Sequence, residues 1–334
     1  MKKLQNMKLL VTGGLGFIGS NFILHVLQNK KDIEIINLDA EIYGSNKKNL
    51  ENLQVKDRYK FVKGDIVDSE LMGKLIAESY AVINFAAESF VDRSIADASP
   101  FFESNVRGVF NILEILKNSK KRFLQISTDE VFGSLQENSA VEETRFNPSS
   151  PYAATKAAAE LLINSYGTTF DCDYVITRCT NNFGPRQFPE KLIPKVILLA
   201  SQEKSIPVYG NGKNIRDWIF VEDHCKAILS VLENGNSKTS YNISSENEMD
   251  NLTIIEKILE IMKKPRDLIT FVEDRPGHDY RYSMKSDKIK NELQWKPEMN
   301  FDSALKKTVE WYLKNESWWN DLSPEFLNTT PWKN

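Results

Sequence analysis

The amino-acid sequence predicts an α/β protein in which a doubly wound parallel sheet is followed by a smaller C-terminal α/β lobe. Three observations support this fold class. Short apolar runs rich in β-branched residues recur along the first half of the chain, with segments of helical composition between them. A glycine-rich turn directly follows the first run, and an apolar helical segment directly follows that turn. Finally, 334 residues with 41% hydrophobic side chains can bury a core of the required size.

The strands of the first sheet are expected at six runs, residues 8–12, 34–39, 59–65, 81–87, 122–128 and 173–179. These runs are almost continuously apolar rather than alternating, which is typical of strands covered by helices on both faces. Because helical segments separate them, the runs indicate βαβ units and therefore parallel strands.

After residue 185 the pattern loosens. Short strands are expected at 207–209 and 241–244, and helices at 192–201 and 252–263. We therefore divide the chain into a first domain, residues 1–185, and a second lobe, mainly residues 186–334, with a helix near 221–232 that returns to the first sheet. Four tryptophans near the end are interpreted as packing residues: Trp311, Trp318, Trp319 and Trp332.

The composition argues against several classes of protein. Lys and Arg number 43 and Asp and Glu 46, so the formal charge of -3 provides no positive field for nucleic acid or an anionic membrane. No run approaches the roughly 20 apolar residues of a membrane-spanning helix. The basic start is not followed by a signal-peptide core, and Cys172, Cys179 and Cys225 lack metal or redox spacing. We expect a cytoplasmic protein without a metal, nucleic-acid or membrane partner.

The turn after the first expected strand, residues 12–19, has the glycine pattern of a Rossmann dinucleotide site in the required order of strand, turn and helix. Gly13 permits the tight turn, Gly16 lets the backbone approach a pyrophosphate, and Gly19 allows close packing of helix on strand. Phe17 and Ile18 are expected to line the same turn. A glycine-rich turn without a ligand is the alternative, and the strand and helix around it argue against that.

The second expected strand ends in Asp39, whose carboxylate can accept hydrogen bonds from the adenosine ribose. It would repel the extra phosphate of NADP, and the next residues, Ala40 and Glu41, supply no arginine, so NAD is the expected cofactor. Two further strand ends are expected to border the dinucleotide, although each alone also fits an ordinary loop: Asp65 and Ile66, then Phe85, Ala86, Ala87 and Ser89.

A tyrosine and a lysine, Tyr152 and Lys156, stand four residues apart at the start of a helical segment, so both side chains lie on one face. A nearby cation favours the phenolate, and we expect Lys156 and the nicotinamide cation together to lower the pKa of Tyr152 by roughly three units. The spacing is common by chance, but here it follows a dinucleotide turn.

Asp129 and Glu130, beside the hydroxyl of Thr128, emerge at the same sheet edge, where paired carboxylates can divide acid and base roles. A solvated acidic turn is the other interpretation.

Five longer blocks then carry a resemblance: residues 86–94, 127–133, 181–194, 216–224 and 275–282. With the glycine turn and the Tyr152–Lys156 pair, they make the chain similar to the extended short-chain dehydrogenase/reductase superfamily, and within it to the dTDP-glucose 4,6-dehydratases. The resemblance covers nearly the whole sequence. It implies a lyase of nucleotide-sugar metabolism that converts dTDP-glucose to dTDP-4-keto-6-deoxyglucose and water for deoxysugar biosynthesis, such as that of rhamnose.

The resemblance also implies a role for each catalytic residue. Tyr152 would take the proton of the sugar 4-hydroxyl, with Thr128 hydrogen-bonded to that oxygen and Lys156 supporting the phenolate. Glu130 would remove the C5 proton, and Asp129 would protonate the departing 6-hydroxyl. The hydride taken from C4 returns to C6, so NAD would stay tightly bound and be recycled in each turnover.

The remaining implied positions come from the family pattern. Ser104 and Asn182 would lie against NAD, and the chain would form a homodimer. The nucleotide-sugar site, in the second lobe and the cleft, would comprise Ser89, Thr128, Asn181, Lys191, Leu192, Pro207, Val208, Tyr209, Arg216, Asn251, Arg275 and His278, with the two arginines suited to a diphosphate.

Three residues depart from the family pattern: Phe90 stands where histidine is usual, Phe132 where tyrosine is usual, and Ala40 where lysine is common. None removes a proposed catalytic group.

Two alternatives share the glycine turn and the tyrosine–lysine pair: a UDP- or CDP-glucose dehydratase and a nucleotide-sugar 4-epimerase. An epimerase does not need Asp129 and Glu130 as an acid–base pair. A catalytically idle NAD(H)-binding protein is the alternative from another class.

Overall fold

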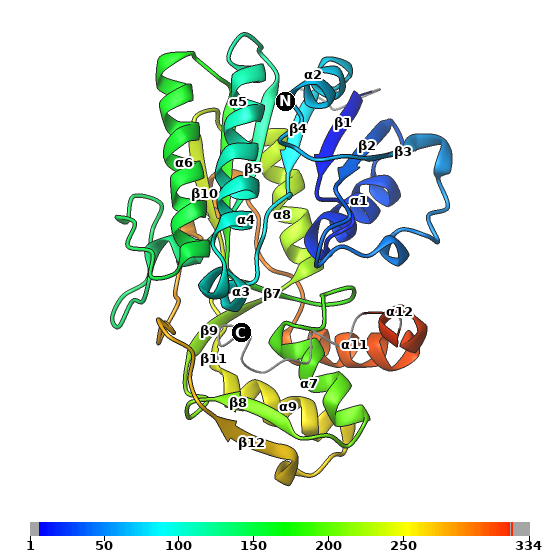
Figure 1. Ribbon diagram of the computed structural model, residues 1–334, viewed down its shortest axis with the longest axis vertical. Helices are drawn as coiled ribbons and strands as arrows, with labels where there is room; N and C mark the ends of the chain where they lie inside the picture. The colour runs from blue at the N-terminus through cyan, green and yellow to red at the C-terminus, as the bar shows by residue number, and fades with distance from the viewer. Residues whose placement is uncertain (1–6, 321, 323–334) are drawn as a thin grey trace.

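The computed structural model describes residues 7–320 and residue 322, arranged as a large upper lobe and a smaller lower lobe (Figure 1). Trp332, expected to be a packing residue, lies outside the described residues. In the described part of the chain, none of the helices combines the length and apolar character needed to cross a bilayer.

The upper lobe contains a sheet of seven strands in the order β10-β6-β5-β4-β1-β2-β3, and every neighbouring pair is parallel. The fold class predicted from the sequence is therefore confirmed. The strands are β1 (Met7–Thr12), β2 (Ile33–Asp39), β3 (Tyr59–Lys63), β4 (Ala81–Asn84), β5 (Arg122–Thr128), β6 (Tyr174–Cys179) and β10 (Thr239–Ile243).

Helices cover both faces of this sheet (Figure 1). Helices α1 (Phe17–Asn29) and α8 (Val221–Asn234) pack on one face, and their buried residues share a core with β1, β2 and β4. Helices α2 (Ser69–Glu78), α5 (Val109–Leu116) and α6 (Pro151–Thr169) pack on the other face. This double covering explains why the strands are apolar along their whole length.

Strand β10 is the edge strand beside β6, with Tyr241 paired to Thr177. The sequence pattern places residues 241–244 in the C-terminal lobe, and that assignment is wrong. Helix α8 is the reason, because Val221, Cys225 and Ile228 pack in the core shared with α1 and return the chain to the first sheet before β10 begins.

The lower lobe has its own core, formed by helices around two small sheets. Strands β7 (Asn181–Phe183), β9 (Ile215–Phe220) and β11 (Glu248–Asp250) form one sheet, and β8 (Ile206–Tyr209) pairs with β12 (Ile269–Val272) in the other. Helices α7 (Leu192–Ser201), α9 (Asn251–Met262), α11 (Phe301–Lys314) and α12 (Glu316–Asn320) pack against them, whereas α10 (Asp287–Leu293) lies against β10. The ring centroids of Trp311 and Trp318 are 5.1 Å apart, and Trp319 is buried, so these three tryptophans pack as expected.

Candidate active site

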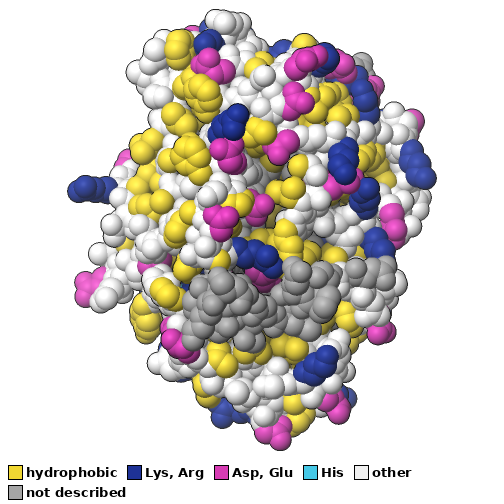
Figure 2. Space-filling view, viewed as in Figure 1, with side chains coloured by type: hydrophobic (Ala, Val, Ile, Leu, Met, Phe, Trp, Pro, Cys, Tyr) yellow, Lys and Arg dark blue, Asp and Glu magenta, His cyan; other side chains and the backbone are white. Residues whose placement is uncertain are grey.

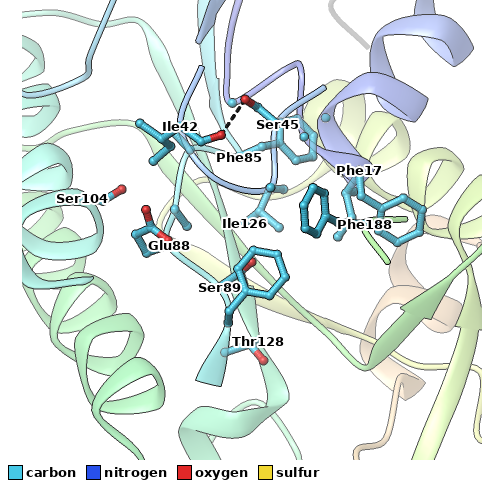
Figure 3. Close-up of a pocket in the computed structure, with 18 of the residues that line it drawn as sticks. Phe17, Ile42, Ser45, Phe85, Glu88, Ser89, Ser104, Ile126, Thr128 and Phe188 are labelled. Atoms are coloured by element: carbon cyan, nitrogen blue, oxygen red, sulfur yellow. Dashed lines mark hydrogen bonds between the residues drawn. The ribbon is translucent and has the colours of Figure 1, made fainter. Parts of the chain in front are cut away.

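A cavity of about 470 Å³ opens beyond the carboxyl ends of β1, β2, β4 and β5, where open α/β sheets bind their ligands. Ile42 and Ser45, from the loop after β2, lie at one end of it, and Thr128, from the end of β5, lies at the other (Figure 3). The cavity is long and shared by many loops, as a dinucleotide site must be.

The glycine turn lies against the end of β4. Gly13 has a φ of 70°, and a Cβ on it would stand 2.6 Å from the backbone nitrogen of Ala86. A Cβ on Gly19 would stand 2.4 Å from the carbonyl oxygen of Gly13, so neither position has room for a side chain. Gly16 precedes α1 and provides no side-chain cap, so the amide groups of the first turn remain available beside the cavity.

Asp39 ends β2 at the wall of the cavity. Its carboxylate accepts hydrogen bonds from the backbone nitrogens of Leu15 (2.9 Å) and Glu41 (2.8 Å), and burial raises its pKa. Glu41 forms ion pairs with Lys47 (2.8 Å) and Lys63 (2.9 Å). The two lysines were not visible in the sequence pattern, because neither is adjacent to Asp39 along the chain.

Tyr152 and Lys156 lie at the far end of the cavity, on the first turns of α6. This helix begins sharply because Ser150 accepts a hydrogen bond from the backbone nitrogen of Ala153 and Pro151 occupies the first helical position. The ammonium of Lys156 donates to the carbonyl oxygen of Ile126 (2.7 Å), and burial lowers its pKa to about 8. One turn of helix therefore holds both groups at the end of β5.

The protein's own groups raise the pKa of Tyr152. Burial raises it well above its ordinary value, the nearby carboxylate of Glu130 raises it further, and only a hydrogen bond with Thr128 acts in the other direction. The lowering expected from Lys156 together with the nicotinamide cation therefore stays a prediction for the protein with NAD bound. Lys156 is directed to the carbonyl of Ile126 instead.

Thr128, Asp129 and Glu130 follow β5 directly, and all three line the cavity. Asp129 accepts a hydrogen bond from the Thr128 hydroxyl (3.2 Å). Burial, and then the charge of Glu130, raises the pKa of Asp129 strongly. Burial also raises the pKa of Glu130, but Arg275, Lys191 and Arg216 oppose the rise. Asp129 Oδ2 and Glu130 Oε2 are both buried without a hydrogen-bond partner among the described residues.

A buried histidine fixes the amide of Asn182, which lines the cavity near Lys156. Asn182 Nδ2 donates to the carbonyl oxygen of Thr180 (3.0 Å), so its Oδ1, 2.8 Å from His224 Nδ1, must accept from the imidazole. Burial lowers the pKa of His224 to about 3, which keeps the ring neutral. The sequence analysis included His224 in a family block but gave it no role.

The cavity brings together most of the residues predicted for the site. Those that line it are Gly13, Gly16, Phe17, Ile18, Gly19, Asp39, Asp65, Ile66, Phe85, Ala86, Ala87, Ser89, Ser104, Thr128, Asp129, Glu130, Tyr152, Lys156, Asn181, Asn182 and Lys191. Ser104 reaches it from a π-helical turn, Glu103–Gly108, between α4 (Ser99–Phe102) and α5. Such turns are often found at functional sites.

The other predicted residues lie outside the cavity lining, in the lower lobe. They are Leu192 at the start of α7, Pro207, Val208 and Tyr209 on β8, Arg216 on β9, Asn251 at the start of α9, and Arg275 and His278 after β12. Val208 is buried in the lower core, so only its backbone can face a ligand. His278 pairs with Asp274 (2.6 Å).

The two arginines nevertheless act on the carboxylates in the cavity. Arg216 is almost fully buried, donates to the carbonyl oxygens of Ile215 (2.7 Å) and Asp279 (2.9 Å), and lies over the ring of Tyr282. Its charge affects Asp129, and the charges of both Arg216 and Arg275 affect Glu130. Positive charge from the lower lobe therefore faces negative charge from the upper one.

Several lining residues were missed by the sequence analysis. Glu88 lies beside Ser89 and opposite Phe188 (Figure 3), and burial raises its pKa. Ser127 and Thr180 line the cavity with buried hydroxyls that have no hydrogen-bond partner in the described part of the chain. Their positions at the ends of β4, β5 and β6 were the available signal. Among residues 7–320 and 322, no group of three or more His, Cys, Asp or Glu is arranged to hold a metal ion.

The family model described as GDP-mannose 4,6 dehydratase matches residues 10–308. The chain belongs to this family. The low-salt glycan biosynthesis protein Agl12 of Haloferax volcanii is 47% identical over 311 residues, which are 93% of this chain and all of the relative. The dTDP-glucose 4,6-dehydratase of Shigella flexneri is 42% identical over 341 residues, covering 93% of this chain and 94% of the relative.

Solved structures also resemble this chain over most of its length. DesIV of Streptomyces venezuelae, a dTDP-glucose 4,6-dehydratase with NAD bound, superimposes with a TM-score of 0.92 at 40% identity, covering 95% of this chain and all of that one. The UDP-glucuronic acid 4-epimerase of Bacillus cereus, also with NAD, gives 0.87 at 27% identity, covering 92% and 99%. The resemblance inferred from the sequence blocks is thereby confirmed.

Proposed function

We propose that this protein is a dTDP-glucose 4,6-dehydratase that uses NAD. The observation that carries the proposal is the pair Asp129 and Glu130, which stand side by side in the cavity that also holds Tyr152 and Lys156. Besides NAD as the hydride acceptor, oxidation at C4 needs only the tyrosine and lysine. Elimination of water across C5 and C6 also needs an acid and a base, and this pair supplies both.

NAD fits the upper part of the cavity. The free amides at the start of α1 suit its pyrophosphate, and Asp39 suits the adenosine ribose, with Asp65 and Ile66 toward the adenine. When bound, NAD supplies the acceptor for the hydride from C4 and the donor that returns it to C6. Its nicotinamide cation would lie near Tyr152, where it supplies the lowering of the tyrosine pKa that the protein's own groups do not provide.

The residues divide the proton transfers. Tyr152 takes the proton of the 4-hydroxyl, and Thr128 hydrogen-bonds the same oxygen. The resulting ketone acidifies the C5 proton, which Glu130 removes, while Asp129 gives its proton to the departing 6-hydroxyl so that water leaves. The strongly raised pKa of Asp129 supports its role as the acid, since it favours the protonated form that a proton donor needs.

The dTDP-glucose would span both lobes, with its diphosphate at Arg216 and Arg275. We propose that residues 1–185, with α8, bind NAD and that residues 186–334 supply most of the nucleotide-sugar site. The specificity for dTDP rests on the relatives that carry this name, because a charged diphosphate does not distinguish thymidine from uridine or cytidine. The three free cysteines support a reducing compartment, the cytoplasm.

We further propose a homodimer through the face formed by α4, α5 and α6. Phe102, Phe110 and Leu161 are 56%, 44% and 60% exposed on these three helices. Figure 2 shows apolar side chains gathered over this part of the upper lobe, whereas acidic and basic side chains are mixed elsewhere on the same view. An exposed apolar face of this kind marks an interface.

The test is incubation of the purified protein with dTDP-, UDP- and CDP-glucose, followed by mass spectrometry. We expect loss of one water from dTDP-glucose and no need for added cofactor, with NAD(H) recovered when the protein is denatured. Inversion at C4 without loss of water would identify an epimerase and contradict the proposal. Recovery of mainly NADP(H) would contradict the assignment of the cofactor.

A further inference from the structure

Asp92 joins the two lobes at the edge of the proposed substrate site. It lies on α3 (Val91–Ala96), a short helix of the upper lobe, two residues after Phe90 of the cavity wall. Its Oδ1 accepts from Arg275 Nη1 at 2.5 Å, and its Oδ2 accepts from the hydroxyl of Tyr209 at 3.1 Å. One carboxylate thus holds two side chains of the lower lobe that are far apart in the sequence.

The contact with Asp92 leaves the recognition edge of Arg275 unused. Arg275 Nε is buried and has no hydrogen-bond partner among the described residues. Because Asp92 engages Nη1, the guanidinium keeps the edge formed by Nε and Nη2, which can grip two oxygens of one phosphate. The same guanidinium is close enough to Glu130 for their charges to interact, so Arg275 lies near the reacting end of the cavity.

Nearby cations balance the negative charge of Asp92. Lys191 and Lys195 both interact electrostatically with Asp92, as Arg275 does. Three cations therefore face three carboxylates, those of Asp92, Glu130 and Glu190, so the negative charge of Asp92 is balanced. A carboxylate at this place serves to orient a guanidinium rather than to repel a diphosphate.

We propose that Asp92 is a positioning residue for the nucleoside diphosphate of the substrate, acting through Arg275 and Tyr209. This inference rests on the proposed function, since it deepens the assignment of the diphosphate site. Without the charged carboxylate, the contact that orients the free edge of Arg275 is weakened, and so is the hydrogen bond from the Tyr209 hydroxyl to Asp92.

The experiment measures binding of dTDP by calorimetry to the NAD-loaded protein. We expect Asp92→Asn, which keeps the size of the side chain and removes its charge, to raise the dissociation constant about tenfold, as loss of one charged hydrogen bond would. Asp97→Asn is the matched control, because Asp97 directly follows the same helix at an exposed position, where it accepts a hydrogen bond from the backbone nitrogen of Ser99. Tyr209→Phe is a second variant and should raise the constant by a smaller factor, about threefold.

A double-mutant cycle separates positioning from a general effect on folding. In a chain that already carries Arg275→Ala, adding Asp92→Asn should weaken dTDP binding by at most the roughly threefold effect that acts through Tyr209, not by about tenfold. With dTDP-glucose as substrate, Asp92→Asn should raise KM and leave kcat within about twofold, since the diphosphate does not react.

Unchanged or tighter binding by Asp92→Asn overturns the inference, because it would mean that Asp92 is idle or competes with the diphosphate for Arg275. Should that variant fail to fold, unchanged binding by Tyr209→Phe overturns it equally. Failure of the proposed function is distinguishable: the wild type would then bind dTDP without dehydrating dTDP-glucose.

Discussion

At the scale of single residues, the site places two adjacent carboxyl groups in different environments. Asp129 is buried beside the charge of Glu130, and both effects raise its pKa. Glu130 is also buried, but Arg275 and Lys191 favour its charged form. Burial and the charge of Glu130 therefore favour the protonated form of Asp129, whereas the nearby cations favour the charged form of Glu130.

The first prediction at this scale concerns that division of roles. Asp129→Asn should still oxidise C4 but eliminate water about 10²–10⁴ times more slowly, because an amide cannot donate the proton. Reduced cofactor should accumulate when this variant meets substrate, and solvent deuterium should enter C5. Glu130→Gln is the matched comparison, and it should lose turnover with little exchange at C5, since its base is missing. Wild-type dehydration by Asp129→Asn would rule out its role as the acid.

A second prediction concerns the stability cost of Lys156. Burial lowers its pKa from 10.5 to about 8, so the charged form is unfavourable in the folded protein. Lys156→Met should therefore abolish activity yet stabilise the cofactor-free protein at pH 7 by about 2 kcal/mol. Removing the buried charge stabilises the folded protein by roughly 3 kcal/mol, from the pKa shift, and losing the hydrogen bond to Ile126 costs about 1 kcal/mol.

The pH dependence of stability tests whether burial lowers the pKa of Lys156. The unfolded chain binds more protons at Lys156 than the folded protein does between about pH 8 and 10.5, so the wild type should gain stability relative to Lys156→Met as the pH rises through 8. Urea unfolding of both proteins across this range measures it. A constant difference would show that Lys156 has an ordinary pKa.

At the scale of elements, the start of α1 depends on the absence of side chains. Gly19 faces the carbonyl oxygen of Gly13 across the turn, and the helix can approach β1 only because no Cβ intervenes. Gly73 in α2 offers a matched contrast, because a Cβ there would meet nothing within 4 Å. The two glycines differ only in what surrounds them.

We therefore predict opposite effects of the same substitution. Gly19→Ala should destabilise the protein by about 1–3 kcal/mol and weaken NAD binding, since the helix must shift away from the turn. Gly73→Ala should stabilise it by about 1 kcal/mol, because alanine is the better helix former. Thermal unfolding with and without NAD distinguishes the two, and equal effects would mean that the turn has more freedom than the structure indicates.

At the scale of the whole molecule, the α4–α6 face should hold two copies together. Leu161→Glu places a charge at its most exposed apolar residue, and we expect the variant to be monomeric in analytical ultracentrifugation. Leu313→Glu is the control, because Leu313 is 51% exposed on α11 in the other lobe. A wild type that sediments as a monomer, or a Leu161→Glu variant that stays dimeric, would contradict this interface.

The sequence by itself determined the local features of this protein. Apolar runs and the glycine turn specify strands and the first helix, because backbone conformation and burial follow from neighbouring residues. The same holds for Tyr152 and Lys156, whose spacing on one helix face is fixed by helical geometry. Many of the predicted cofactor residues lie together because they stand at or just after the carboxyl ends of parallel strands.

Only the tertiary structure decided the features that depend on residues far apart in the chain. The position of β10 follows from the packing of α8 on α1, which no local pattern in residues 241–244 records. Burial and the charge of Glu130 raise the pKa of Tyr152, although Lys156 lies only one helical turn away. The bridge from Asp92 to Arg275 joins residues 183 positions apart. Burial and electrostatic interactions act through space, and so they are settled only when the chain has folded.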